Sequence, residues 1–185
     1  MTHPAQNPFL SIDDYLTGED GSEIRHEYLD GQIYAMTGAS DRHGLITLNI
    51  ASFLRPLLRS THCQLFASDM KVRLRVNQQE LVYYPDLLLS CDPTDRETYF
   101  RRAPCLLVEV LSDSTARIDQ REKLFAYQTI PSLQDYLIVS QTQRVLQIHR
   151  RLRDWTPEHI TEGGVWLDCI QVELALDVIY EDVPV

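Results

Sequence analysis

Long apolar runs are missing from this sequence. No stretch approaches the ~20 consecutive apolar residues that a membrane-spanning helix needs. The first residues, MTHPAQNPFLSIDDY, also lack the basic start and apolar stretch of a secretion signal. These absences predict a cytoplasmic protein that does not enter a membrane. The length of 185 residues predicts a single domain, with no linker, repeat or low-complexity segment to divide it.

Clustered cysteines and glycine-rich loops are missing too. The four cysteines, Cys63, Cys91, Cys105 and Cys169, form no C-x-x-C pair, and none lies near a histidine at zinc-finger spacing. They are therefore predicted to be reduced thiols, mostly buried, and a structural zinc is not expected. Neither G-x-x-x-x-G-K-[ST] nor G-x-G-x-x-G occurs, so a nucleotide-cradling loop has no support.

Lysine is scarce, with only Lys71 and Lys123, and the formal net charge is -10. A nucleic-acid partner needs basic side chains for its phosphates, so this charge argues against one. The distribution weakens the objection, because residues 42–153 hold 16 Lys and Arg against 11 Asp and Glu, a balance of +5. A basic middle between acidic ends permits a polyanion, and an acidic solvated surface is the alternative.

The patterns that are present predict an α/β fold. Capping and turn residues give a short helix at SIDDYL after Ser11 and a hairpin at IRHEYLDGQIYAM around Asp30-Gly31. Hydrophobic periodicity gives a helix from about His43 to Arg59, capped by Ser40 or Asp41 and bent or ended by Pro56. Residues 1–40 are predicted to form an N-terminal helix and hairpin extension of the single domain.

Strands dominate the middle and the end of the chain. DMKVRLRV alternates as a strand with one wet, basic face, while LVYYPDLLLS and CLLVEVL read as strands covered on both faces. The helix RIDQREKLFAYQTI, capped near Ser114 or Thr115, separates CLLVEVL from the strand DYLIVS, so these two strands should be parallel. RVLQIHRR, HITEGGVWLDCI and VELALDVIY suggest further strands and a short terminal helix. The predicted architecture is a mixed central sheet flanked by helices.

Two carboxylates stand inside apolar strands. Glu109 lies within LLVEVL and Asp86 within YYPDLLL, after Pro85, which suggests a bulge or a sheet edge. Burying an ionised carboxylate without a partner costs several kcal/mol, so Glu109 needs a cation. An arginine is one possibility, and a divalent metal held by both carboxylates is the other.

Lys123 is the basic group that topology brings near Glu109. The strand runs ~10 Å from Glu109 to its end, and the helix returns ~9 Å from its start near Arg117 to Lys123, so the two side chains reach similar heights. A surface ion pair with Asp119, four residues earlier, is the alternative role for Lys123. With two carboxylates, the lysine would complete a site for phosphodiester hydrolysis.

Together these residues resemble the PD-(D/E)xK nuclease superfamily, with Pro85-Asp86 and Glu109-Val110-Leu111 as its motif. The lysine expected two residues after the glutamate is Leu111 here, and the superfamily tolerates its migration to the next helix, where Lys123 lies. HEYLDGQIYAMTGAS, His43, YYPDLLLS, VEVLSDST, Asp119 with Lys123, and PSLQDYLIV together resemble the Uma-two family of restriction-endonuclease-like proteins. The similarity runs from about Ser11 to Tyr180.

The resemblance implies a restriction-endonuclease-like fold and a Mg²⁺- or Mn²⁺-dependent endonuclease acting on nucleic acid, with DNA the expected substrate. Asp86, Glu109 and the backbone carbonyl of Val110 would bind the metal, and Lys123 would position the water. Glu27 would be an additional acidic residue, or else a polar hairpin residue. His43 would approach the metal or a phosphate, or else make a local hydrogen bond.

A rival interpretation is a nuclease fold that has lost catalysis and serves as a binding or assembly module. The acidic net charge and the scarcity of lysine favour it, and the joint presence of Glu27, Asp86, Glu109 and Lys123 opposes it. Cutting both strands of a duplex would favour a homodimer by symmetry.

Overall fold

The computed structural model describes residues 9–36, 38–111 and 119–185. Within these ranges no helix is both long enough and apolar enough to cross a bilayer. The start of the expected helix RIDQREKLFAYQTI, with its cap near Ser114 or Thr115, lies outside the described residues.

The N-terminal elements form as their local signals predict. Helix α1 (Ile12–Glu19) begins after Ser11, whose hydroxyl accepts the Asp14 N–H. Strands β1 (His26–Leu29) and β2 (Gln32–Ala35) pair antiparallel around Asp30 and Gly31, which both have positive φ. Helix α2 (Asp41–Leu57) is capped by Ser40 and ends one residue after Pro56. The hairpin and both helices are thus confirmed.

Two mixed sheets and one small hairpin make up the rest. The remaining elements are β3 (Gln64–Ala67), β4 (Lys71–Val76), β5 (Gln79–Tyr83), β6 (Leu87–Ser90), β7 (Phe100–Arg101), β8 (Pro104–Leu111), η1 (Asp119–Lys123), α4 (Leu124–Tyr127), β9 (Asp135–Ser140), β10 (Leu146–Arg150), η2 (Arg151–Arg153), β11 (Glu158–Ile160), β12 (Gly164–Leu167), β13 (Val172–Ala175) and α5 (Leu176–Ile179). The five-stranded sheet has the order β2-β1-β5-β4-β7, and the six-stranded sheet has the order β11-β10-β9-β8-β6-β3. The predicted parallel pairing of β8 with β9 is confirmed.

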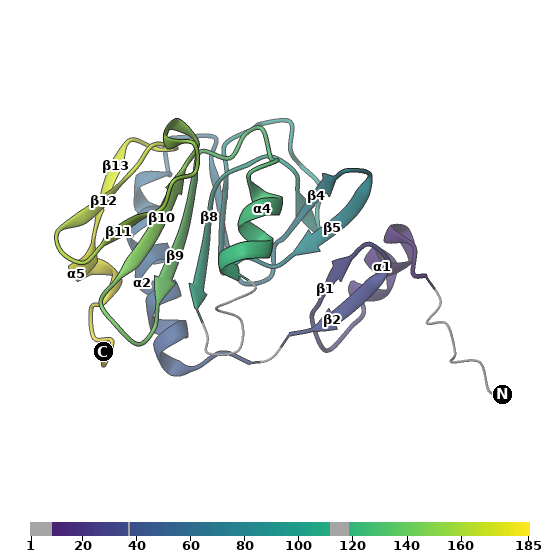
Figure 1. Ribbon diagram of the computed structural model, residues 1–185, viewed down its shortest axis with the longest axis horizontal. Helices are drawn as coiled ribbons and strands as arrows, with labels where there is room; N and C mark the ends of the chain where they lie inside the picture. The colour runs from purple at the N-terminus through teal and green to yellow at the C-terminus, as the bar shows by residue number, and fades with distance from the viewer. Residues whose placement is uncertain (1–8, 37, 112–118) are drawn as a thin grey trace.

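Helices cover both faces of the six-stranded sheet. Figure 1 shows α2 behind strands β9 and β10, and α4 beside β8 on the side of β4. Alternation along β8 explains the two layers, because Val108 and Val110 pack into the apolar cluster that contains α2, whereas Leu107 packs with α4. Glu109 lies between Val108 and Val110 and shares the α4 face with Leu107. The predicted α/β architecture with a mixed sheet is confirmed.

The segment LVYYPDLLLS is not one strand, contrary to the prediction. It divides at Tyr84, Pro85 and Asp86, so that β5 belongs to the five-stranded sheet and β6 to the six-stranded sheet. Pro85 has no N–H to donate to a ladder, which explains why pairing stops there. Asp86 therefore lies at the point where the chain passes from one sheet to the other.

The basic face predicted for β4 is also wrong in part. Arg75 is exposed, but Lys71 is only 5% exposed. Its ammonium lies 3.7 Å from Asp20 and over the rings of Tyr84 and Tyr99. Burial of Lys71 is possible because aromatic faces and a carboxylate replace the water around its charge. Strands β3 and β7, which the sequence analysis did not predict, extend the two sheets.

The prediction of four reduced, mostly buried thiols is wrong. The structure pairs Cys63 with Cys91 and Cys105 with Cys169 as disulfides, and of the four only Cys105 is buried. The pairing of β3 with β6, which sets Gln64 opposite Ser90, brings the first two cysteines together. Sequence spacing could not reveal this, because the partners are 28 and 64 residues apart.

Candidate active site

A cavity of about 760 Å³ opens between the two sheets and the start of α2. All of the residues singled out from the sequence line it: Glu27, His43, Asp86, Glu109, Val110 and Lys123. They come from β1, α2, the β5–β6 junction, β8 and η1, so only the fold brings them together. Arg25, Tyr34, Tyr84 and Gln141 contribute further polar groups to its wall.

Lys123 connects two of the acidic residues. Its ammonium lies 2.8 Å from Glu27 Oε1 and donates a hydrogen bond of 3.2 Å to Glu109 Oε1. Lys123 and Glu109 are each 4% exposed, so this contact is shielded from solvent. The expectation that Lys123 reaches the level of Glu109 is therefore correct, and the lysine does not point into bulk solvent. The side chain of Asp119, its alternative partner, lies outside the described residues.

Tyr127 is a member of the site that the sequence analysis missed. Its hydroxyl donates a 3.0 Å hydrogen bond to the same oxygen of Glu109 that Lys123 contacts, and the side chain is fully buried. Burial, with the negative charge of Glu109, raises the pKa of Tyr127 well above its usual value, so the hydroxyl keeps its proton. The sequence could have indicated Tyr127, because it follows Lys123 by four residues and residues at this spacing share one face of a helix.

Asp86 is held by the backbone and by a histidine. Its Oδ2 accepts the Val110 N–H at 2.7 Å, and its Oδ1 lies 3.1 Å from His43 Nε2. The antiparallel pairing of Leu87 with Val108 in β6 and β8 sets Asp86 beside Glu109 in neighbouring strands. His43 reaches across from the first turn of α2, and its own N–H is capped by the Ser40 hydroxyl. His43 therefore makes a local hydrogen bond through its backbone N–H and also contacts Asp86 of the candidate site through its side chain.

Two more tyrosines keep the wall of the site neutral. Burial is the main cause that raises the pKa of Tyr83 to about 12, and the negative charge of Glu27 is the second. The Lys123 ammonium lies over the ring of Tyr83. Burial also raises the pKa of Tyr84, whose hydroxyl donates to Glu19. Because neither phenol ionises near neutral pH, the negative charge in the cavity comes from its carboxylates.

The charges and donors of the cavity fit a hard divalent cation. Three carboxylates, of Glu27, Asp86 and Glu109, face it, and the ammonium of Lys123 offsets only one of them. Arg25, the other strong base among the described residues of the wall, is paired at 3.0 Å with Asp69. Carboxylate oxygens and a backbone carbonyl are the ligands that Mg²⁺ and Mn²⁺ prefer. The excess of negative charge in a sheltered cavity favours uptake of a cation.

Comparison with known proteins identifies the family. The family model Uma2, described as "Putative restriction endonuclease", matches residues 12–178. The chain therefore belongs to the Uma2 family. It is 38% identical over 186 residues to the uncharacterized protein slr1290 of Synechocystis sp., covering 97% of both chains. It is also 33% identical over 140 residues to the uncharacterized protein sll1609 of the same organism, covering 74% of this chain and 78% of that protein.

A solved structure has the same fold. The crystal structure of a "putative nuclease belonging to DUF820" from Anabaena variabilis superposes with a TM-score of 0.75 at 15% sequence identity. The match covers 92% of this chain and 97% of the other. This likeness confirms the expected restriction-endonuclease-like fold. Membership of the Uma2 family, together with this fold, makes the chain a restriction-endonuclease-like protein.

Proposed function

We propose that this Uma2 protein is a divalent-metal-dependent endonuclease that hydrolyses phosphodiester bonds of DNA. The observation that carries the proposal is the meeting of Asp86, Glu109 and Lys123 in one cavity, although the three lie on separate elements. Glu109 and Lys123 are buried and Asp86 is partly buried, which is costly for charged groups, and such clusters are typical of catalytic sites.

In this proposal the carboxylates of Asp86 and Glu109 and the carbonyl of Val110 would hold one Mg²⁺ or Mn²⁺. Such an ion would supply Lewis-acid chemistry for phosphodiester hydrolysis. The Val110 N–H fixes Asp86, and the Tyr127 hydroxyl fixes Glu109, so both ligands are oriented before a cation arrives. Because the two carboxylates are already oriented, cation binding does not have to pay the entropy cost of ordering flexible side chains.

Lys123 positions the attacking water and stabilises the charge that develops on the phosphate. Its contacts with Glu27 and Glu109 hold the ammonium at the cavity wall. Glu27 then serves to orient Lys123 and can contact the metal through water. His43, bound to Asp86 Oδ1, lies in the first turn of α2, where a phosphate is favoured by the helix dipole.

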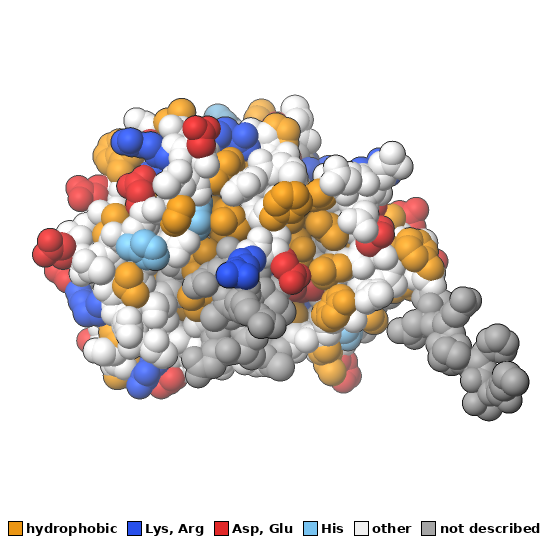
Figure 2. All heavy atoms as spheres, in the orientation of Figure 1, with side chains coloured by type: hydrophobic (Ala, Val, Ile, Leu, Met, Phe, Trp, Pro, Cys, Tyr) orange, Lys and Arg blue, Asp and Glu red, His pale blue; other side chains and the backbone are white. Residues whose placement is uncertain are grey.

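The charge distribution on the face shown in Figure 2 suggests modest electrostatic attraction to DNA. On the face shown in Figure 2, basic side chains of the described residues alternate with acidic and apolar ones rather than forming a continuous patch. Few phosphate contacts mean a shallow dependence of binding on salt. Because each chain holds one candidate site, cutting both strands of a duplex favours a two-fold symmetric dimer.

Titration of Mg²⁺ and Mn²⁺ during cleavage of plasmid and oligonucleotide DNA tests the proposal. We expect metal-dependent cleavage by the wild type and its loss in Asp86→Ala. The matched control is Asp177→Ala, which removes an exposed carboxylate paired with Arg144 outside the cavity and should cut at the wild-type rate. Equal cleavage by wild type and Asp86→Ala would refute the site.

Calorimetry separates catalysis from the rival role as a binding or assembly module. A nuclease takes up Mg²⁺ in the wild type and loses that uptake in Asp86→Ala. Absence of both cleavage and cation uptake in the wild type would overturn the proposal in favour of a catalytically inactive module.

A further inference from the structure

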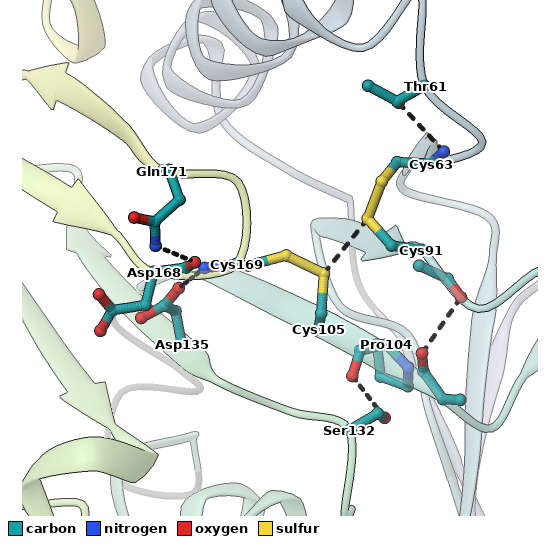
Figure 3. Close-up of a disulfide and its surroundings, with 12 residues drawn as sticks. Thr61, Cys63, Cys91, Pro104, Cys105, Ser132, Asp135, Asp168, Cys169 and Gln171 are labelled. Atoms are coloured by element: carbon teal, nitrogen blue, oxygen red, sulfur yellow. Dashed lines mark hydrogen bonds between the residues drawn. A yellow bond between two sulfur atoms is a disulfide. The ribbon is translucent and has the colours of Figure 1, made fainter.

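All four cysteines of the chain meet at one place. Cys63 precedes β3, Cys91 follows β6, Cys105 is the second residue of β8, and Cys169 lies in the turn between β12 and β13. Figure 3 shows the disulfides Cys63–Cys91 and Cys105–Cys169 side by side, with the sulfurs of Cys91 and Cys105 facing each other. Those two sulfurs are 3.7 Å apart. Four cysteine sulfurs from four segments therefore lie in one cluster.

The cluster is separate from the candidate active site. Asp86 stands before β6 and Cys91 after it, so the two lie at opposite ends of that strand. Along β8, Cys105 is four residues before Glu109, which is about 13 Å at ~3.3 Å per residue. Among the described residues that line the candidate active site, none is a cysteine. The cysteines are thus not part of the proposed nuclease chemistry.

Three of the four sulfurs lie close enough together to share one metal ion. Zinc binds thiolate at about 2.3 Å, which places the sulfurs of a tetrahedral set roughly 3.8 Å apart. The separation of Cys91 and Cys105 already matches this value. The sulfurs of Cys91, Cys105 and Cys169 all lie within 4.8 Å of one another. The sulfur of Cys63 is bonded to Cys91 and lies outside this set of three, so the reduced Cys63 side chain must turn toward the other sulfurs to complete the tetrahedron.

We propose that the reduced protein binds one Zn²⁺ through Cys63, Cys91, Cys105 and Cys169, and that the two disulfides are the oxidised, metal-free state of the same site. Thiolate sulfur is the ligand that selects zinc over magnesium or calcium. Cys63, Cys91 and Cys169 are partly exposed, so a metal ion or an oxidant can reach the cluster. The bound zinc would tie β3, β6 and β8 to the β12–β13 hairpin.

Each step balances. Zinc binding releases four protons from the four thiols. Oxidation of the zinc-bound thiolates by a low-molecular-weight disulfide forms two protein disulfides, releases Zn²⁺, and transfers four electrons to two oxidant molecules. These molecules take up four protons and leave as four thiols. The protein thus exchanges a metal crosslink for two covalent ones.

The wild-type protein, purified under reducing conditions, supplies the first test. We expect one zinc per chain by elemental analysis. Substitution by Co²⁺ should give intense thiolate-to-metal charge-transfer absorption together with the visible bands of tetrahedral cobalt. Zinc present at 1,000 times its Kd should raise the Tm on the order of 10 °C. A reduced wild type that takes up no stoichiometric zinc, or a cobalt spectrum without thiolate bands, would overturn the proposal.

Variants show where the metal binds. Cys63→Ser and Cys169→Ser each change a partly exposed ligand, and we expect zinc affinity to fall at least 100-fold. The control is Asp86→Ala, which empties the candidate active site and should still bind one zinc. Zinc uptake that is lost in Asp86→Ala and retained in the cysteine variants would place the ion in the carboxylate cavity and refute the thiolate site. The wild-type cobalt spectrum decides the question if a cysteine variant does not fold.

Treatment of the zinc-loaded protein with oxidised glutathione tests the second half of the proposal. Zinc release should follow the same time course as the loss of four hydrogens from the protein mass. Peptide mapping should recover the pairs Cys63–Cys91 and Cys105–Cys169. Zinc retained after both disulfides have formed would contradict the claim that the two states share one site. Both tests read out metal and thiols, so their outcome is independent of nuclease activity.

Discussion

Replacing Lys123 by methionine removes the one ammonium that the described residues place in the cavity wall, while keeping most of the volume of the side chain. In the wild type, Lys123 Nζ lies 2.8 Å from Glu27 Oε1 and 3.2 Å from Glu109 Oε1. At an effective dielectric of about 20 these separations correspond to roughly 6 and 5 kcal/mol of attraction, much of which is offset by the cost of dehydrating the groups. Without the ammonium, two sheltered carboxylates lose their cation and repel each other.

The stability lost in Lys123→Met has an upper limit, because one of the two glutamate carboxyls can take up a proton instead of staying ionised. An unfolded glutamate has a pKa of about 4.3, so keeping one such carboxyl protonated at pH 7 costs about 3.7 kcal/mol. We therefore expect the free energy of unfolding to fall by about 4 kcal/mol at pH 7. At pH 5 protonation costs roughly 2.7 kcal/mol less, so the deficit relative to wild type should shrink by about that amount. Added Mg²⁺ should stabilise the variant more than the wild type.

Urea unfolding at pH 7 and pH 5, with and without Mg²⁺, measures these differences, and DNA cleavage by the same samples should fall at least 100-fold. Lys71→Met is the matched control, because Lys71 is equally buried but lies outside the cavity beside Asp20. It should lose stability and keep the intrinsic rate of cleavage. A deficit in Lys123→Met that does not change with pH, or cleavage at the wild-type rate, would refute the reasoning.

Two further predictions concern buried polar groups. Tyr127→Phe removes a hydrogen bond to the Glu109 carboxylate and should lower the free energy of unfolding by about 2 kcal/mol. The control Tyr34→Phe, at an exposed phenol, should change it by less than about 0.5 kcal/mol. Equal effects of the two substitutions in urea unfolding would contradict the burial argument. Burial lowers the pKa of His149, so its contribution to stability is complete above about pH 6.5 and is lost as pH falls from there through the lower folded-state pKa. His149→Gln should flatten this part of the stability curve, and an unchanged slope would show that another group titrates.

Local patterns were sufficient to predict the elements whose cause is local. Asp30-Gly31 adopts the positive φ values that a two-residue hairpin turn needs, and Ser40 caps α2. The parallel pairing of β8 with β9 could be predicted because the sequence pattern gives a strand, then a helix, then a strand. The meeting of Glu109 with Lys123 followed from the same topology, since the heights of the two residues could be estimated from the rise per residue.

Features that depend on distant pairing could not be predicted in this way. Pro85 indicated an irregularity, but not that β5 and β6 would enter different sheets. Lys71 alternates with apolar residues as a surface residue would, yet Tyr84 and Tyr99 cover it. The cysteine cluster depends on pairing between strands and on the β12–β13 turn, which no spacing in the sequence encodes. In each case the decisive neighbour is far away in the chain.

The position of the lysine shows how one chemical arrangement can be reached from two elements. Side chains two residues apart on a strand share a face, so Leu111 projects from β8 on the same side as Glu109. Leu111 packs there in the apolar cluster that contains Ala126 and Tyr127 of α4. Lys123 approaches that same face from η1, the segment directly before α4, and meets Glu109 at 3.2 Å. The ammonium therefore depends on the packing of α4 against the sheet, and Tyr127 connects that packing to Glu109. A change in the α4 contact would displace the lysine and the hydroxyl together, so this interface is a structural determinant of the candidate site.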